Sequence, residues 1–290
     1  MYDTENLDAL SDEKEIHFLL RARHPRLVHF FGAGRCPDGN VFVVLEFMSE
    51  GALQDHISKT SSTRSLLWFD RVNIVMDIVC GMCFLHDVMD SLHRDLKCGN
   101  VLLSKDIKSQ HLRGKIADFG LSKFTSNDLQ EKAGEAIMSE SSTLSFDSFD
   151  SSDRYTTMTC GIGTPTHMAP EVWAMREQAR MTKKIDIYSF GIIMWEILEM
   201  KPAWHDIKFS YKISKKVCRG ERPKISHDHK DSKGGEPPKA YIEIMKQCWE
   251  SDPKSRPKFS DVRKVFENSG VIVRDSSRDF SGDGVPATKS

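Results

Sequence analysis

Two short runs of polar residues have types that suit chemistry on a phosphate group. Residues 93–100 read His-Arg-Asp-Leu-Lys-Cys-Gly-Asn, and residues 118–120 read Asp-Phe-Gly. They supply a carboxylate, an ammonium and an amide close together, followed by a second carboxylate. Carboxylate and amide oxygens are ligands that a hard cation such as Mg²⁺ accepts, and a lysine meets a phosphate as a point charge. Each run alone is a weak signal, but their order and spacing together are specific.

With Ala-Pro-Glu at residues 169–171, these runs match the signature of eukaryotic protein kinases, including the spacing between the Asp and the Asn. The chain therefore resembles a protein kinase over residues 8–267. The run Asp-Ile-Tyr-Ser-Phe-Gly at 186–191 and the pair Cys248-Trp249 resemble the tyrosine-kinase-like branch of Ser/Thr kinases. The resemblance implies an α+β, bilobal fold with a truncated N-lobe and a mostly α-helical C-lobe.

The resemblance assigns roles to the polar residues. Phosphoryl transfer passes through a loose transition state, so the protein mostly positions groups and neutralises charge. By resemblance, Asp95 would accept or orient the proton of the attacking hydroxyl, and Lys97 would face the γ-phosphate of ATP. Asn100 and Asp118 would hold Mg²⁺ through their oxygens. ATP and Mg²⁺ are the implied cofactors, and a protein is the implied substrate.

The nucleotide-binding groups are also placed by the resemblance. Leu45 falls at the gatekeeper position, and the backbone groups of Glu46 and Met48 would bind the adenine edge. Leu102 belongs to the same set of nucleotide-binding positions. Glu15 matches the glutamate of helix C, which points toward the nucleotide cleft.

Thr164 bears on which hydroxyl is phosphorylated. Tyrosine kinases usually replace the Leu-Lys after the catalytic aspartate with Ala-Ala-Arg or Arg-Ala-Ala. Here Lys97 is present, and by resemblance Thr164 hydrogen-bonds the Asp95/Lys97 pair. This favours a Ser/Thr acceptor, although a dual-specificity kinase stays open. His167 departs from the aromatic residue that relatives commonly have before Met-Ala-Pro-Glu.

Further matches imply structural roles. Glu171 and Arg256 resemble the ion pair that ties the activation segment to the C-lobe. Asp186 resembles the aspartate that holds the backbone of the catalytic loop. Four more residues fit the stacked regulatory column of kinases, and they are Leu19, Phe30, His93 and Phe119.

The Gly-rich phosphate loop and the strand lysine of kinases have no match in the chain. The lysine usually lies well upstream of the helix-C glutamate, which would place it before Met1. We therefore expect the first three N-lobe strands to be absent from these 290 residues. Two interpretations stay open. One is a Ser/Thr kinase recorded without its N-terminal segment, and the other is a catalytically silent, kinase-like interaction module (a pseudokinase).

The elements that must position these residues follow from the hydrophobic pattern. Residues 8–23 predict a helix that His24-Pro25 ends, and 27–33 with 41–47 predict a β-hairpin across a turn at 37–40. We expect this hairpin to be the only clear sheet of the first hundred residues. Helical periods then predict four helices, over residues 68–86, 185–199, 239–249 and 260–267.

The domain organisation follows from these elements. We expect one kinase domain over residues 1–268, with an N-lobe remnant at 1–47 and a C-lobe at 48–268. Residues 125–159 are crowded with Ser, Thr, Asp and Glu and lack an apolar period, which predicts a long disordered insert in the activation segment. The polar residues 269–290 predict a flexible tail.

Arg94, which precedes the catalytic aspartate, is typical of kinases that a phosphate in the activation segment switches on. Three threonines lie closest to the usual position of that phosphate, and they are Thr156, Thr157 and Thr159. We therefore expect an upstream kinase as a partner.

Charge and composition exclude several other classes of protein. The chain has 41 basic and 42 acidic residues, so it offers no electrostatic footprint for a nucleic acid. No apolar run approaches the ~20 residues that span a bilayer. Seven cysteines, an odd number, and no signal-peptide pattern indicate a reducing compartment. We expect a cytoplasmic protein without a membrane span or a nucleic-acid partner.

Overall fold

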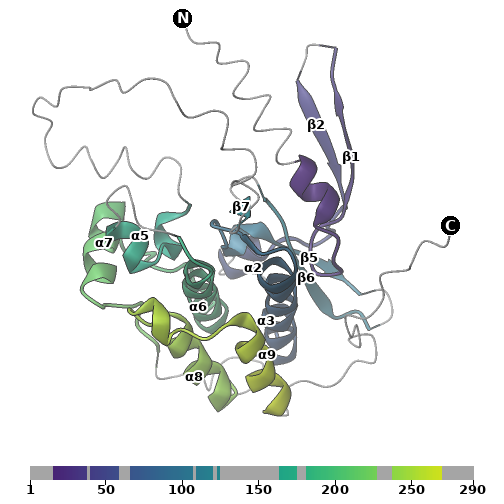
Figure 1. Cartoon of the computed structure of the whole chain (residues 1–290). Coiled ribbons are helices and arrows are strands. Elements are labelled where there is room, and N and C mark those ends of the chain that lie inside the picture. Colours follow the sequence, from purple (N-terminus) through teal and green to yellow (C-terminus); the bar gives the residue numbers. More distant parts are fainter. Residues whose placement is uncertain are drawn as a thin grey trace, which may run out of the picture.

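The structure is a computed structural model of the chain, and it describes residues 16–37, 40–58, 66–106, 109–119, 123–124, 163–174, 181–226 and 237–269. A β-hairpin projects at one end beside a short N-terminal helix, and a body made mainly of helices lies at the other end (Figure 1). This is the α+β, mostly helical arrangement that the sequence predicted. None of the described helices is both long and apolar enough to cross a membrane.

The helical body is built around α3 (Trp68–Cys83) and α6 (Lys184–Glu199), each of 16 residues. All residues of α6 from Ile185 to Leu198 are buried, as in a helix that the core surrounds on every side. α8 (Lys239–Cys248) lies against α6, and α9 (Phe259–Asn268) lies against α3. Three of these helices agree with the predicted bounds to within one residue, and the predicted helix 68–86 is divided between α3 and a π-helical turn, Phe84–Val88.

The predicted hairpin is confirmed, with shifted ends. β1 (Phe30–Arg35) pairs antiparallel with β2 (Val41–Leu45). Residues 16–21 are helical, and the part of the predicted helix before residue 16 lies outside the described residues, as do turn residues 38–39. The hairpin is thin, so it leaves large apolar side chains exposed, namely Phe31, Phe42, Val43, Val44, Leu45 and Phe47.

Among the described residues, the hairpin is the only sheet that lies wholly within the first hundred residues, but a second sheet, mostly beyond residue 100, was not predicted. β3 (Gly51–Ala52), β5 (Val101–Lys105) and β6 (Leu112–Ile116) form a second sheet in the order β3-β5-β6. Its strands have two to five residues, and β6 reads Leu-Arg-Gly-Lys-Ile, which has no apolar run to signal a strand. A short helix, α2 (Leu53–Ser58), follows β3 where the sequence predicts that a helix begins, whereas α7 (Ser210–Cys218) was not predicted.

The segment before the hairpin is tied to the body by backbone and charge. Ile116 N–H donates to the Arg26 carbonyl (2.9 Å), and Val28 N–H donates to the Ile116 carbonyl (2.8 Å). The Asp77 carboxylate of α3 is buried and pairs with Arg26 Nε at 2.9 Å and Arg113 Nε at 3.4 Å. These contacts fix the base of the hairpin against β6 and α3.

His24 lies three residues after the end of the N-terminal helix, in a half-buried position. Its ring stacks on Phe84 with centroids 4.9 Å apart, and its Nδ1 accepts the Arg26 N–H at 3.1 Å. Burial, with a smaller contribution from the positive charge of Arg26, lowers the pKa of His24 to about 4. An unfolded histidine has a pKa of ~6.5. Between about pH 4 and this value, the unfolded chain therefore binds a proton at His24, whereas the folded chain does not. Stability therefore falls as the pH falls through this window.

We predict that His24→Asn reduces the loss of stability between pH 7 and pH 5. The Asn Oδ1 can still accept the Arg26 N–H, but the side chain no longer titrates. The measurement is the thermal midpoint of unfolding of both proteins at both pH values. The comparison is how far the midpoint of each protein falls on acidification. An equal drop in the two proteins would show that His24 does not titrate as inferred.

Candidate active site

Three hydrogen-bonded side chains form the centre of the site: Asp95, Lys97 and Thr164. Lys97 Nζ donates to Asp95 Oδ2 at 2.5 Å and to Thr164 Oγ1 at 2.9 Å. Thr164 Oγ1 donates to Asp95 Oδ1 at 2.7 Å, across a sequence separation of 69 residues. The loop that follows β4 (Ser91–Leu92) carries the first two residues, and Thr164 precedes a 3-10 turn, η3 (Pro165–His167). The fold thus brings together three residues that the resemblance grouped.

These neighbours control the charge of Asp95. Burial raises the pKa of the Asp95 carboxyl, but the hydrogen bonds from Lys97 and Thr164, together with the charge of Lys97, outweigh burial. The net result is a pKa below the ordinary value of an aspartate. Asp95 is therefore an ionised acceptor at neutral pH.

Asn100 is buried beside Asp95 at the end of a second 3-10 turn, η2 (Cys98–Asn100). Its Nδ2 donates to the Asp95 carbonyl at 2.9 Å and to Asp95 Oδ2 at 3.3 Å. Because the amide nitrogen is engaged, the amide oxygen is the atom of Asn100 that can serve a cation. The carboxylate of Asp118 is exposed. An amide oxygen and a carboxylate fit the hard-oxygen preference of Mg²⁺.

Asp186, on the first turn of α6, holds the backbone of the loop. The His93 N–H donates to its Oδ2 and the Arg94 N–H to its Oδ1, both at 2.9 Å, and His86 Nε2 lies 2.8 Å from Oδ2. Burial raises the pKa of Asp186, yet the hydrogen bond and charge of His86 outweigh burial and lower the pKa below its ordinary value. The predicted anchoring role of Asp186 is confirmed.

Phe119 lies between the N-terminal helix and the loop of residues 93–100. Its ring centroid is 5.4 Å from that of Phe18 and 5.6 Å from that of His93. His93 is fully buried, and its Nε2 lies 3.1 Å from the Ala117 carbonyl. Burial lowers the pKa of His93, which fits a packing role. Leu19 and Phe30 belong to the same core, whereas Phe18 is a contact that the sequence did not reveal.

The predicted hinge is a short segment after β2. The Glu46 N–H donates to the His29 carbonyl at 2.8 Å, and the Met48 carbonyl accepts the Gly51 N–H at 3.2 Å. Within the described part of the chain, the Glu46 carbonyl and the Met48 N–H make no hydrogen bond. These are groups that could meet an adenine edge. The Glu46 side chain is engaged elsewhere, with Lys115 Nζ at 2.6 Å from Oε1.

A small apolar cluster lies beside the hinge. Val28, Met48 and Ala117 are buried together, and Leu102 is packed against them. The structure thus brings Met48 and Leu102 into one apolar cluster, which includes Ala117, the residue before Asp118. Glu15 lies outside the described residues, and so do residues 125–159, the three candidate threonines and the predicted tail.

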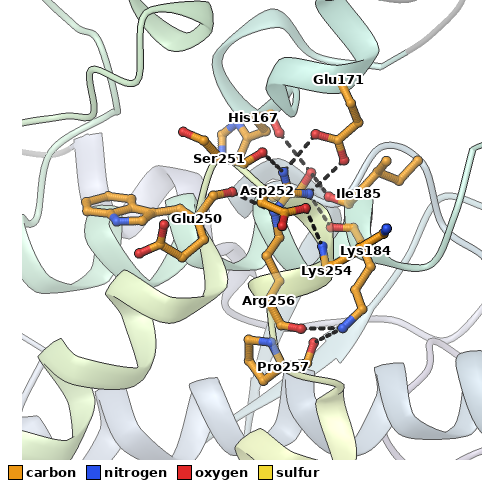
Figure 2. Close-up of polar contacts among 12 residues, drawn as sticks. His167, Glu171, Lys184, Ile185, Glu250, Ser251, Asp252, Lys254, Arg256 and Pro257 are labelled. Carbon is orange, nitrogen blue, oxygen red and sulfur yellow. Dashed lines mark hydrogen bonds and ion pairs between the residues drawn. The ribbon is translucent and has the colours of Figure 1, made fainter.

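The ion pair between Glu171 and Arg256 is confirmed, and it is more extensive than the sequence indicated. The guanidinium of Arg256 faces the Glu171 carboxylate (Figure 2). Its Nη1 donates to Glu171 Oε1 and its Nη2 to Oε2, each at 2.7 Å. The remaining N–H groups donate to backbone carbonyls of Lys184, Glu250 and Ser251. Because a guanidinium has five N–H donors, the side chain of Arg256 is fully satisfied while fully buried.

His167, the departure from the family pattern, is buried against α6. Its Nε2 lies 3.3 Å from Oε2 of Glu196, an acidic residue buried within α6. Burial raises the pKa of Glu196, but the charge of His167 and the hydrogen bond that the Ala203 N–H donates to Oε1 at 2.7 Å outweigh burial, and the net pKa is lowered. The His167 carbonyl also accepts the Ser189 hydroxyl at 2.9 Å. Glu196 interrupts the apolar run from Phe190 to Leu198, a pattern that indicates a buried acid but does not identify its partner.

The comparisons with known proteins identify the family of the chain. A profile of the protein kinase domain matches residues 3–265, and the chain belongs to the protein kinase family. Among curated relatives, "Serine/threonine-protein kinase VIK" of Arabidopsis thaliana is 32% identical over 276 residues, which are 90% of this chain and 52% of the relative. "Dual specificity protein kinase shkC" of Dictyostelium discoideum is 28% identical over 283 residues, 97% of this chain and 47% of the relative. The chain spans about half the length of these two relatives.

We predict that Arg256→Lys destabilises the fold by about 3 kcal/mol, because a lysine cannot replace five fixed donors and leaves buried acceptors unpaired. The measurement is the free energy of unfolding in urea. The matched control is Arg263→Lys, since Arg263 pairs with Glu267 where both side chains are 43–46% exposed. Such a surface pair contributes about 0.5 kcal/mol or less. Equal effects of the two substitutions would contradict the stabilising role of the buried pair.

Proposed function

We propose that the chain transfers the γ-phosphate of ATP to Ser or Thr hydroxyls of a protein. The observation that carries this proposal is the hydrogen-bonded group of Asp95, Lys97 and Thr164. Asp95 is ionised and held at both oxygens, so it can accept a hydrogen bond from the attacking hydroxyl and then its proton. Lys97 brings a positive charge to the same point, where negative charge accumulates on the transferring phosphoryl group.

The metal and nucleotide sites belong to the same proposal. Asn100 and Asp118 would hold Mg²⁺, which when bound neutralises phosphate charge. The Glu46 carbonyl and the Met48 N–H would bind the adenine edge, and Leu102 would cover a face of the ring together with Val28 and Ala117. Glu15 would serve the nucleotide from helix C.

Thr164 supports a hydroxyl acceptor of the Ser/Thr type. Its own hydroxyl bridges Asp95 and Lys97, so it fixes the direction of the carboxylate toward a short acceptor side chain. The relatives' names include a Ser/Thr kinase and a dual-specificity kinase. We propose Ser/Thr specificity, with phosphorylation of tyrosine as the outcome that would revise it.

The wider setting extends the proposal. We propose a domain over residues 1–268, divided near residue 47 into an N-lobe part and a C-lobe. An upstream kinase would act on Thr156, Thr157 or Thr159, and Arg94 would meet the added phosphate. A cytoplasmic location and a role in a signalling pathway fit such regulation.

We predict that Asp95→Asn lowers phosphate transfer by about 10²–10⁴-fold, the range for loss of a general base. The measurement is the intact mass of the chain and of a generic protein substrate after incubation with Mg-ATP. The matched control is Asp87→Asn, an exposed aspartate on the turn Phe84–Val88. Phosphates that also appear with Asp95→Asn would contradict the assigned role. If the unaltered chain adds no phosphate, the silent kinase-like interaction module is supported instead.

We also predict that Thr164→Val lowers kcat for a serine peptide by about tenfold or more, because it removes two hydrogen bonds to charged groups, one from Lys97 and one to Asp95. Thr164→Ser retains the hydroxyl and should restore most of the rate. The KM for ATP should be the same in all three proteins, because Thr164 lies on the acceptor side of Asp95. A larger effect on the KM for ATP than on kcat would place Thr164 in the nucleotide site.

A further inference from the structure

We propose that α7 and the residues just before it form a docking surface for an acidic segment of the protein substrate. The inference rests on the proposed function for its biological role, but the surface itself is a separate feature. It consists of the aromatic residues Phe209 and Tyr211 and the lysines Lys208, Lys212 and Lys215. We call this set the α7 surface.

The α7 surface exposes two aromatic rings that lie outside the hydrophobic core. Ile213, Ser214 and Val217 bury the inner side of α7. Phe209 is 49% exposed and Tyr211 is 41% exposed, and their ring centroids lie 5.8 Å apart. Neighbouring exposed rings of this size are unusual on a surface that has no partner, and they mark interaction sites.

Three ammonium groups lie over these rings. Lys208 Nζ and Lys212 Nζ are 6.0 and 5.4 Å from the centroid of Phe209, and Lys215 Nζ is 5.6 Å from that of Tyr211. In the part of the chain that the structure describes, no carboxylate lies within ion-pair distance of these three lysines. The neighbouring Lys216 differs, because it pairs with Glu221 at 2.6 Å. The α7 surface therefore combines apolar area with three positive charges that form no ion pair with an acid of the described residues.

The position of α7 connects this surface with the substrate side of the site. α7 packs against η3 and against α5 (Pro170–Ala174), as Figure 1 shows for α5. η3 directly follows Thr164, whose hydroxyl contacts Asp95. A protein segment that binds α7 would therefore be held beside the residues that receive the acceptor hydroxyl.

Charge complementarity identifies the occupant. Carboxylates would pair with the three ammonium groups, while an apolar side chain between them would cover the two rings. A nucleic acid or an anionic membrane fits less well, because the positive charge is local and the whole chain has a net charge of −1. We therefore assign the surface to an acidic protein segment with interspersed apolar residues.

The first test measures binding without nucleotide. The probe is a fluorescein-labelled peptide of Glu and Asp with interspersed Phe, and its binding is followed by fluorescence anisotropy. We expect the triple variant Lys208→Gln, Lys212→Gln, Lys215→Gln to bind about tenfold more weakly, and the affinity of the unaltered chain to fall with added salt. The matched control changes the same charge on α8 and α9 through Lys239→Gln, Lys246→Gln and Lys264→Gln, which are exposed lysines.

The outcomes separate this proposal from the proposed function. Equal binding by the two triple variants, or no binding by the unaltered chain, would overturn the docking surface even if the chain phosphorylates a generic peptide. Selective loss in the α7 variant would support it even if no phosphate transfer occurs. Tighter binding of duplex DNA or phosphatidylserine vesicles than of the peptide, lost in the α7 variant, would overturn the assignment to a protein.

A second test links the surface to catalysis. Two serine peptides are compared, one with and one without an acidic extension. We expect the unaltered chain to favour the extended peptide in kcat/KM, and the α7 variant to lose most of this preference while the α8/α9 variant keeps it. A preference that survives in the α7 variant would contradict docking at α7.

Discussion

The geometry of the catalytic loop depends on one buried carboxylate, that of Asp186. The loop must turn sharply at Arg94, whose φ of +71° lies in the left-handed region that a residue with a side chain rarely adopts. Asp186 offsets this strain by accepting two successive backbone N–H groups, of His93 and Arg94. Asp186 is only 1% exposed, so burying its charge is costly. The two backbone hydrogen bonds and the contact with His86 offset this cost by replacing hydrogen bonds to water. The position of Asp95 follows directly from this arrangement.

The same helix controls the opposite side of the site. Ser189 and Glu196 of α6 contact the carbonyl and the ring of His167, so they hold the turn that begins after Thr164. The Thr164 carbonyl accepts the His167 N–H at 3.0 Å, which carries the restraint to Thr164 itself. Two segments far apart in sequence thus meet because each is fastened to α6. A buried helix is a suitable support, since packing leaves it little freedom to move.

The sequence predicted the grouping of Asp95, Lys97 and Thr164 and the positions of the long helices, because both leave strong local signals. Asp95, Lys97 and Asn100 follow one another in a specific motif, and α6 has an apolar run that only a core helix would have. The second sheet was missed, since β3 owes its existence to pairing with β5 rather than to its own two residues. Phe18 and Glu196 were missed for a similar reason. Their roles arise from contacts with Phe119 and His167, which no spacing along the chain reveals.

The two sides of the site differ in how they are supported. The proposed acceptor side, from Asp95 to Thr164, rests on buried charges and on the core between α3 and α6. The hinge side rests on a hairpin whose apolar residues face outward, and Phe47, beside the hinge groups, is 88% exposed. A two-stranded sheet is marginal without a covering layer, whereas buried polar networks are rigid once every member is paired. It follows that the described residues support the proposed acceptor side more firmly than the proposed nucleotide side at the hinge.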